Sequence, residues 1–107
     1  MQNRDRVQTQ KVFRAEKRLK ALSKQKRLLT IKLISQKKSI EELNVMEASV
    51  VYHKIDSILI PRDRLKVIED INETINSLKS QINEIDEKIE KEMNIFKKLA
   101  SNKKPWF

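Results

Sequence analysis

The sequence predicts an all-α protein in which two long helices form an antiparallel coiled-coil hairpin. Each half of the chain carries a stripe of apolar residues spaced alternately three and four apart, the pattern of one helix packed along another. A proline, Pro61, interrupts the pattern between the two stripes. The 107 residues contain no glycine and only two prolines, and a chain so poor in turn-forming residues has few reversals of direction.

The first stripe predicts a helix over about residues 3–56. Its members alternate three and four apart throughout: Val12, Ala15, Leu19, Leu22, Lys26, Leu29, Leu33, Gln36, Ile40, Leu43, Glu47 and Val50. Polar residues in such a seam commonly fix its register at some loss of stability. For Lys26 and Glu47 an equally weighted interpretation is that they are solvated positions near an unpaired stretch.

The reversal is predicted at a tip of about residues 57–60. Pro61 lacks a backbone N–H and disfavours a helical residue before it, so it fits the first turn of a new helix. Asp63 would then lie near the positive end of that helix. We expect the second helix over about residues 61–99, followed by a basic tail, 100–107, with the whole of 1–107 forming one hairpin. A short connection makes the two helices antiparallel neighbours.

The second stripe is the more regular one. Its apolar residues are spaced 3-4-3-4-3-4: Ile68, Ile71, Ile75, Leu78, Ile82, Ile85 and Ile89. Beyond Ile89 the next apolar residues are Met93 and Phe96, four and then three residues on. A 4-4-3 run is closer to an eleven-residue repeat, so the supercoil is expected to relax there.

Charge is distributed unevenly along the chain. The net charge is +9, with +11 in residues 1–40 and −2 in residues 41–107. Folding the chain near residue 59 pairs positions whose numbers add to about 118. The first fifteen to twenty residues, which are strongly basic, are then expected to extend past the end of the second helix as an overhang.

Composition excludes most catalytic chemistry. With no cysteine there are no disulfides, thiolate metal sites or cysteine nucleophiles. His53 is the sole histidine, too little for a metal site or an oriented general base, and no glycine-rich loop is present to bind a nucleotide. No apolar run approaches the roughly 20 residues that cross a bilayer, and the N-terminus is polar. We expect a cytoplasmic protein that is not an enzyme, with no cofactor and no metal.

Two surfaces are candidate contact sites. The basic arm, Arg4 to Lys38, suits nucleic acid or an acidic protein surface. A protein partner is favoured and nucleic acid disfavoured, because the cations are spread around the helix and few aromatic residues accompany them. The second is the apolar tip of Ile58, Leu59 and Ile60, which either caps the seam or contacts a partner.

Two local motifs resemble the stalk proteins of type III secretion, the YscO and flagellar FliJ group. One is Arg62-Asp63-Arg64-Leu65, leading into the isoleucines of the second helix, and the other is the lysine-rich exit from Lys97-Lys98 to Lys103-Lys104-Pro105-Trp106. The resemblance implies a non-enzymatic central stalk that docks on a hexameric secretion ATPase and links it to the export gate. It further implies secretion chaperones as additional partners, a role in virulence, and a position at the cytoplasmic face of a membrane-associated export apparatus.

The resemblance also assigns residues to these partners. The ATPase-binding residues would be those of the paired chain ends: Arg4, Arg6, Lys11, Arg14, Lys17, Arg18, Lys103, Lys104 and Trp106. The export-gate contacts would be Ile58, Leu59 and Ile60. Two alternatives stay open on the residues alone, a basic coiled coil that binds nucleic acid and a coiled-coil scaffold or chaperone-binding protein.

Overall fold

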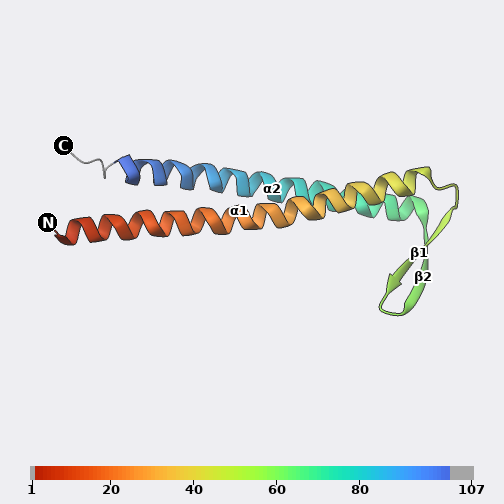
Figure 1. Cartoon of the computed structure of the whole chain (residues 1–107). Helices are drawn as coiled ribbons and strands as arrows, with labels where there is room; N and C mark the ends of the chain where they lie inside the picture. Colours follow the sequence, from red (N-terminus) through yellow and green to blue (C-terminus); the bar gives the residue numbers. More distant parts are fainter. Residues whose placement is uncertain (1, 102–107) are drawn as a thin grey trace. The chain divides into compact units, whose positions relative to one another are not determined.

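The computed structural model describes residues 2–101, and the side chains of residues 6–101. Four elements follow one another along the chain (Figure 1): α1 (Gln2–Val45), β1 (Val50–Ile55), β2 (Ile58–Asp63) and α2 (Arg64–Ser101). The chain divides into two compact units. We call Met1–Leu28 with Ile82–Phe107 the terminal unit, because it contains both chain ends, and Leu29–Gln81 the hairpin unit, because it contains both strands.

The fold is mostly helical, as predicted, but it is not purely all-α. Two long helices are present, and a two-stranded antiparallel sheet is inserted between them. The helix predicted to reach about residue 56 ends at Val45, and the helix predicted from residue 61 begins at Arg64. Neither α1 nor α2 contains, within the residues described, a stretch long and apolar enough to span a membrane.

The strands β1 and β2 form a tight hairpin. Ile55 pairs with Ile58, so only Asp56 and Ser57 make the turn. Asp56 has φ of 54°, in the left-handed region that aspartate tolerates better than most residues. Pro61 lies in β2 and not in a helix. An edge strand accepts proline because one side of its backbone needs no partner.

Asp56→Val is expected to weaken the hairpin, because a β-branched side chain at positive φ is strained. The left-handed conformation costs about 1–2 kcal/mol for such a residue, which corresponds to a factor of about 5–30 in the population of the open form. Hydrogen-bonded pairs alternate along an antiparallel ladder, and the Tyr52–Pro61 pair is not one of them because proline has no N–H. Amide hydrogen exchange at His53 and Ile55, which pair with Ile60 and Ile58, should therefore speed up. Ser57→Val is the control, since Ser57 has no positive φ. Equal exchange in the two valine variants would refute this account of the turn.

Within the hairpin unit, polar contacts join β2 to α2 and α2 to α1. Asp63 caps α2 by accepting a hydrogen bond from the Lys66 backbone N–H at 3.2 Å. Arg62 pairs with Asp70 one turn further along α2, at 2.6 Å between Nη2 and Oδ2. Arg64 donates from Nη1 to the carbonyl of Leu43 at 2.9 Å, which satisfies one of the last carbonyls of α1. The Arg64 contact therefore holds the start of α2 to the end of α1, while the other two fix β2 on α2.

The predicted seams form the core of each unit. In the hairpin unit Leu43, Ile75 and Leu78 are buried, and in the terminal unit Ala15 and Ile85 are buried. All five belong to the stripes identified in the sequence. Every other side chain of residues 6–101 is at least partly exposed, as expected for helices that bury a single stripe.

Cross-helix contacts in the terminal unit set its register. Gln8 donates to the carbonyl of Leu99 at 2.8 Å, Arg18 contacts Glu92 at 3.0 Å, and Lys26 contacts Asp86 at 2.7 Å. The paired numbers add to between 107 and 112, and not to about 118, because residues 46–63 leave the helices and form the connection and hairpin. The predicted overhang of fifteen to twenty residues is therefore wrong, since α2 already accompanies α1 at Gln8.

Two predictions about polar seam positions are resolved. Lys26 is a half-buried member of the seam with an acidic partner, which agrees with a register-fixing residue. Glu47 lies beyond the end of α1 and is exposed, so it is not a seam residue.

The predicted 4-4-3 step is also wrong, because Glu92 takes the seam position and Met93 is 39% exposed. Half-buried positions at Ile89, Glu92 and Phe96 continue the four-three alternation.

Candidate functional site

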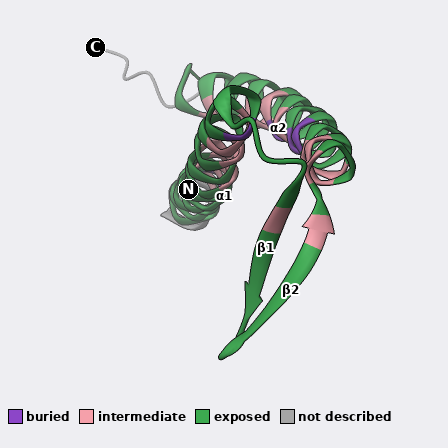
Figure 2. Cartoon of the chain, turned by 90° about the vertical axis from the view of Figure 1, so that its right-hand side faces the viewer, coloured by how far each residue is buried: buried purple, intermediate pink, exposed green. Residues whose placement is uncertain are grey.

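Both strands of the hairpin are exposed along most of their length (Figure 2). Ile55 and Ile58 are paired on one face beside the turn, and Leu59, paired with Lys54, points to the other. Ile58 is 64% exposed and Leu59 61% exposed. The half-buried residues of the two strands, Val51 and Arg62, are paired near the helices. Contiguous exposed apolar surface of this kind marks an interaction site.

Both outer edges of the hairpin lack a neighbouring strand among the residues described, since β1 and β2 pair only with each other. An open strand edge presents unpaired N–H and C=O groups that accept a further strand. The hairpin therefore combines an apolar surface with a template for strand addition.

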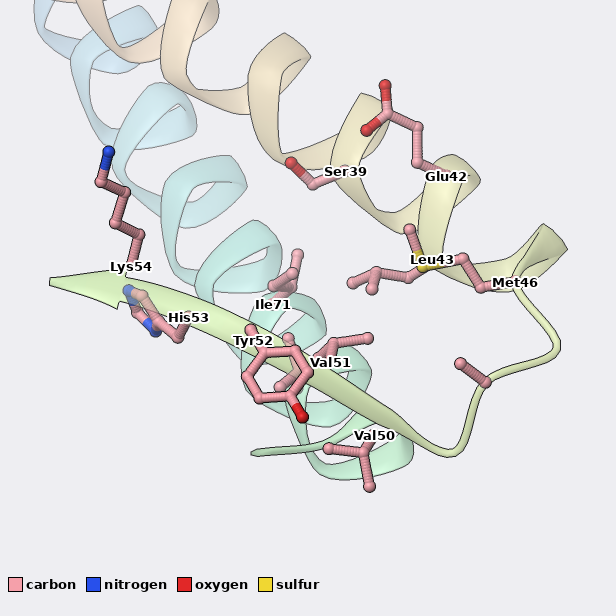
Figure 3. A pocket seen from close by; sticks show the side chains of 12 residues that line it. Ser39, Glu42, Leu43, Met46, Val50, Val51, Tyr52, His53, Lys54 and Ile71 are labelled. Carbon is pink, nitrogen blue, oxygen red and sulfur yellow. The ribbon is translucent and has the colours of Figure 1, made fainter. Parts of the chain in front are cut away.

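A groove of about 500 Å³ lies between β1 and the helices within the hairpin unit (Figure 3). Its lining is mainly apolar: Ser39, Glu42, Leu43, Met46, Ala48, Val50, Val51, Tyr52, His53, Lys54, Val67 and Ile71. His53 is exposed and lies opposite Ile60 in the strand register. Within residues 6–101 no group of three His, Cys, Asp or Glu side chains is arranged to hold a metal ion.

The three predicted tip residues all lie in β2. Ile58, Leu59 and Ile60 are exposed, so they do not cap the coiled-coil seam. Their exposure suits the other interpretation, contact with a partner, which stays a prediction.

The terminal unit contains the whole excess of positive charge. Its residues, 1–28 and 82–107, include sixteen Lys or Arg and seven Asp or Glu, whereas the hairpin unit contains eight of each. The net charge of +9 is thus the charge of the terminal unit, and the hairpin unit is neutral. The exposed apolar hairpin therefore belongs to a unit of zero net charge, whereas the terminal unit is basic.

The terminal unit has a groove of its own, of about 350 Å³. We call it the terminal groove, and it is lined by Arg18, Ala21, Leu22, Lys88, Lys91 and Glu92. The Arg18 guanidinium donates from Nε to Glu92 Oε1 across the two helices. This ion pair is partly exposed, with side-chain exposures of 49% for Arg18 and 19% for Glu92, so its contribution is mainly to register and not to stability.

The basic residues predicted to bind a partner are distributed as follows. Arg6, Lys11 and Arg14 are exposed on α1, and Arg18 is held by Glu92. Lys17 lies over the ring of Phe13, with Nζ 5.3 Å from its centroid. Arg4 belongs to α1, but its side chain lies outside the described residues, as do Lys103, Lys104 and Trp106.

Comparison with known proteins gives two findings. The chain is 28% identical over 80 residues to prefoldin subunit beta of Thermococcus onnurineus (strain NA1), an alignment that covers 74% of this chain and 68% of that protein. The crystal structure of the prefoldin beta subunit from Thermococcus strain KS-1 has the same fold, with a TM-score of 0.85, 18% sequence identity, and coverage of 94% of this chain and 93% of that one. No protein-family model matches the sequence.

These findings overturn the resemblance to type III secretion stalk proteins. Both likenesses are to prefoldin beta. The motifs from Arg62 to Leu65 and from Lys97 to Trp106 lie outside the coiled-coil seams or at their ends, and composition of that kind is common to many coiled coils. Five predictions drawn from that resemblance are therefore wrong: the secretion ATPase, the export gate and the secretion chaperones as partners, the place at the export apparatus, and the role in virulence.

Sequence reasoning missed the strands as a functional element. The signal that could have found them is the run Val50 to Ile55, which contains three β-branched residues and a tyrosine in six positions. Asp56-Ser57 follows, and Ile58-Leu59-Ile60 comes next. Two apolar runs separated by two polar residues are the pattern of a hairpin.

Proposed function

We propose that this chain is a subunit of a prefoldin-type chaperone, which assembles with other subunits through its hairpin and binds unfolded polypeptides. Prefoldin subunits assemble with one another, bind unfolded proteins and have no enzymatic activity. The likeness to two prefoldin beta subunits supports this function. It also supports a cytoplasmic location and the predicted absence of catalysis.

One observation from this chain carries the assembly role. The hairpin is exposed on both faces and open at both edges, and a two-stranded hairpin alone in water is only marginally stable. Strands from other subunits would bury its isoleucines and pair its free backbone groups. Assembly would therefore stabilise the hairpin and the particle together.

The terminal unit supports the binding role. Its exposed apolar side chains include Val7, Phe13, Met93 and Ile95, at 49%, 57%, 39% and 42% exposure. They lie on helices that bury only one stripe, so an unfolded chain can bury its own apolar residues against them. No nucleotide is needed for binding of this kind.

Mixed with a chemically unfolded protein at the moment of dilution into buffer, the chain should suppress aggregation in proportion to its concentration. Light scattering is the measurement. Suppression should be the same with and without ATP, because binding relies on exposed surface and not on hydrolysis. The matched native protein, added without unfolding, should show no association with the chain by size-exclusion chromatography.

Scattering curves that are identical with and without the chain at every ratio would refute the chaperone function. A requirement for ATP would refute it equally, since it would indicate an enzymatic cycle or an ATPase partner.

A further inference from the structure

Most cations of the terminal unit whose side chains the structure describes form no ion pair within it. Its ion pairs within the described residues are Arg18 with Glu92, Lys26 with Asp86, and Lys20 with Glu16. Lys88 and Lys91 are exposed and form no ion pair within that part of the chain. Of the acids four residues from them along α2, Glu84 and Glu87 are exposed, and Glu92 is already paired with Arg18.

The terminal groove places apolar and cationic groups side by side. Ala21 and Leu22 contribute its apolar lining from α1, and Lys88 and Lys91 line it from α2. Its acid, Glu92, is 19% exposed and already accepts a hydrogen bond from Arg18. An incoming group therefore meets a mainly apolar and positively charged surface.

The same combination continues along both helices. Arg14 precedes Arg18 by four residues, and Ile95 follows Lys91 by four, so each lies on the same helix face as its neighbour in the groove. Arg14 is exposed, and Ile95 is 42% exposed. One more cation on α1 and one more apolar side chain on α2 thus lie a single helical turn from the groove.

We propose that the terminal groove selects unfolded polypeptides in which apolar residues are flanked by aspartate or glutamate. The selection rests on the proposed chaperone function and adds to it the chemical class of the client. Apolar client residues would pack on Leu22 and Ile95, and the neighbouring carboxylates would pair with Lys88 and Lys91. Complementary charge raises the rate of encounter and fixes the orientation of the segment.

A polypeptide fits this surface better than a nucleic acid does. The terminal groove contains no aromatic side chain on which a base could stack. Phe13 lies on α1 outside the lining of the groove, and Lys17 Nζ is 5.3 Å from the centroid of its ring. Exposed Ile95 gains from an apolar client residue and gains nothing from a phosphate backbone.

Three unfolded peptides with the same apolar residues test the proposal. Their intervening residues are Asp and Glu, Ser and Gln, or Lys and Arg, and binding to the full chain is measured by fluorescence anisotropy. The acidic peptide should bind about tenfold more tightly than the neutral one, through several partly exposed charge pairs, and the basic peptide most weakly. At about 1 M salt, where the screening length is about 3 Å, the three affinities should converge.

A matched pair of variants locates the effect. Lys88→Gln/Lys91→Gln neutralises two cations in the terminal groove. It should weaken binding of the acidic peptide about fivefold and leave binding of the neutral peptide unchanged. Lys32→Gln/Lys79→Gln makes the same chemical change in the hairpin unit and should alter acidic-peptide binding by less than about twofold. Helical circular dichroism of both variants should equal that of the unmodified chain, because all four lysines are exposed.

The outcomes separate this inference from the proposed function. Equal binding of the three peptides, or an equal effect of the two variants, overturns the acidic selection and leaves the chaperone function standing. Absence of binding by all three peptides overturns both. Duplex DNA bound as tightly as the acidic peptide, and weakened equally by Lys88→Gln/Lys91→Gln, overturns the selection in favour of a general polyanion surface.

Discussion

Ile58→Lys/Leu59→Lys should convert an assembled particle into single chains of about 12.7 kDa. The two side chains are 64% and 61% exposed and lie on opposite faces of β2. Burying each in an interface contributes about 1.5–3 kcal/mol, and lysine at the same place adds a charge that the interface must desolvate. Two such losses weaken association at least about a hundredfold, at 1.4 kcal/mol for each factor of ten. Sedimentation or mass photometry measures the particle.

The matched control is Ile31→Lys/Ile34→Lys. These residues lie on α1 in the same hairpin unit, with exposures of 58% and 62%, and the substitution adds the same charge. This variant should retain the mass of the unmodified particle. A single-chain mass for the unmodified protein at every concentration, or equal dissociation of the two variants, would contradict assembly through the hairpin.

The helical seams were predictable because helix packing is periodic. Ile75, Leu78 and Ile85 were placed in the core from their spacing alone, and all three are buried. The error at Met93 has a physical reason. The spacing was counted over apolar residues only, whereas Glu92 occupies the seam position with its carboxylate paired to Arg18. A long acidic side chain can take a seam position when a cation on the facing helix reaches it.

The strands escaped prediction because the helical pattern continues into them by coincidence. Leu43, Glu47 and Val50 keep the three-four spacing, although α1 ends at Val45. The turn gave no strong signal either, since Asp56 adopts a positive φ that is usually assigned to glycine or asparagine. Pro61 correctly indicated that the helix does not continue through it, but an edge strand explains its position better than a helix start does.

The same omission explains the error in function. Two long helices with apolar seams and a basic end are compatible with many coiled-coil proteins, so the helices alone cannot identify a partner. The element that distinguishes this fold is the hairpin of residues 50–63. Without it, Ile58, Leu59 and Ile60 had no sheet to belong to, and their exposure could not be connected with assembly.

Ile75→Ala/Leu78→Ala should unfold much of the chain near room temperature. Both side chains are 7% exposed, and each truncation removes about 2–5 kcal/mol of stability from a packed site. Because a domain has only about 5–15 kcal/mol in total and this one buries a single seam, little stability remains. The loss is measured by thermal melting followed by helical circular dichroism, at equal chain concentration because assembly shifts the melting temperature.

Ile34→Ala is the control: its side chain is 62% exposed, so the change in stability should be within about 0.5 kcal/mol. Equal melting of the double variant and the unmodified chain would mean that these helices do not hold the fold through Ile75 and Leu78.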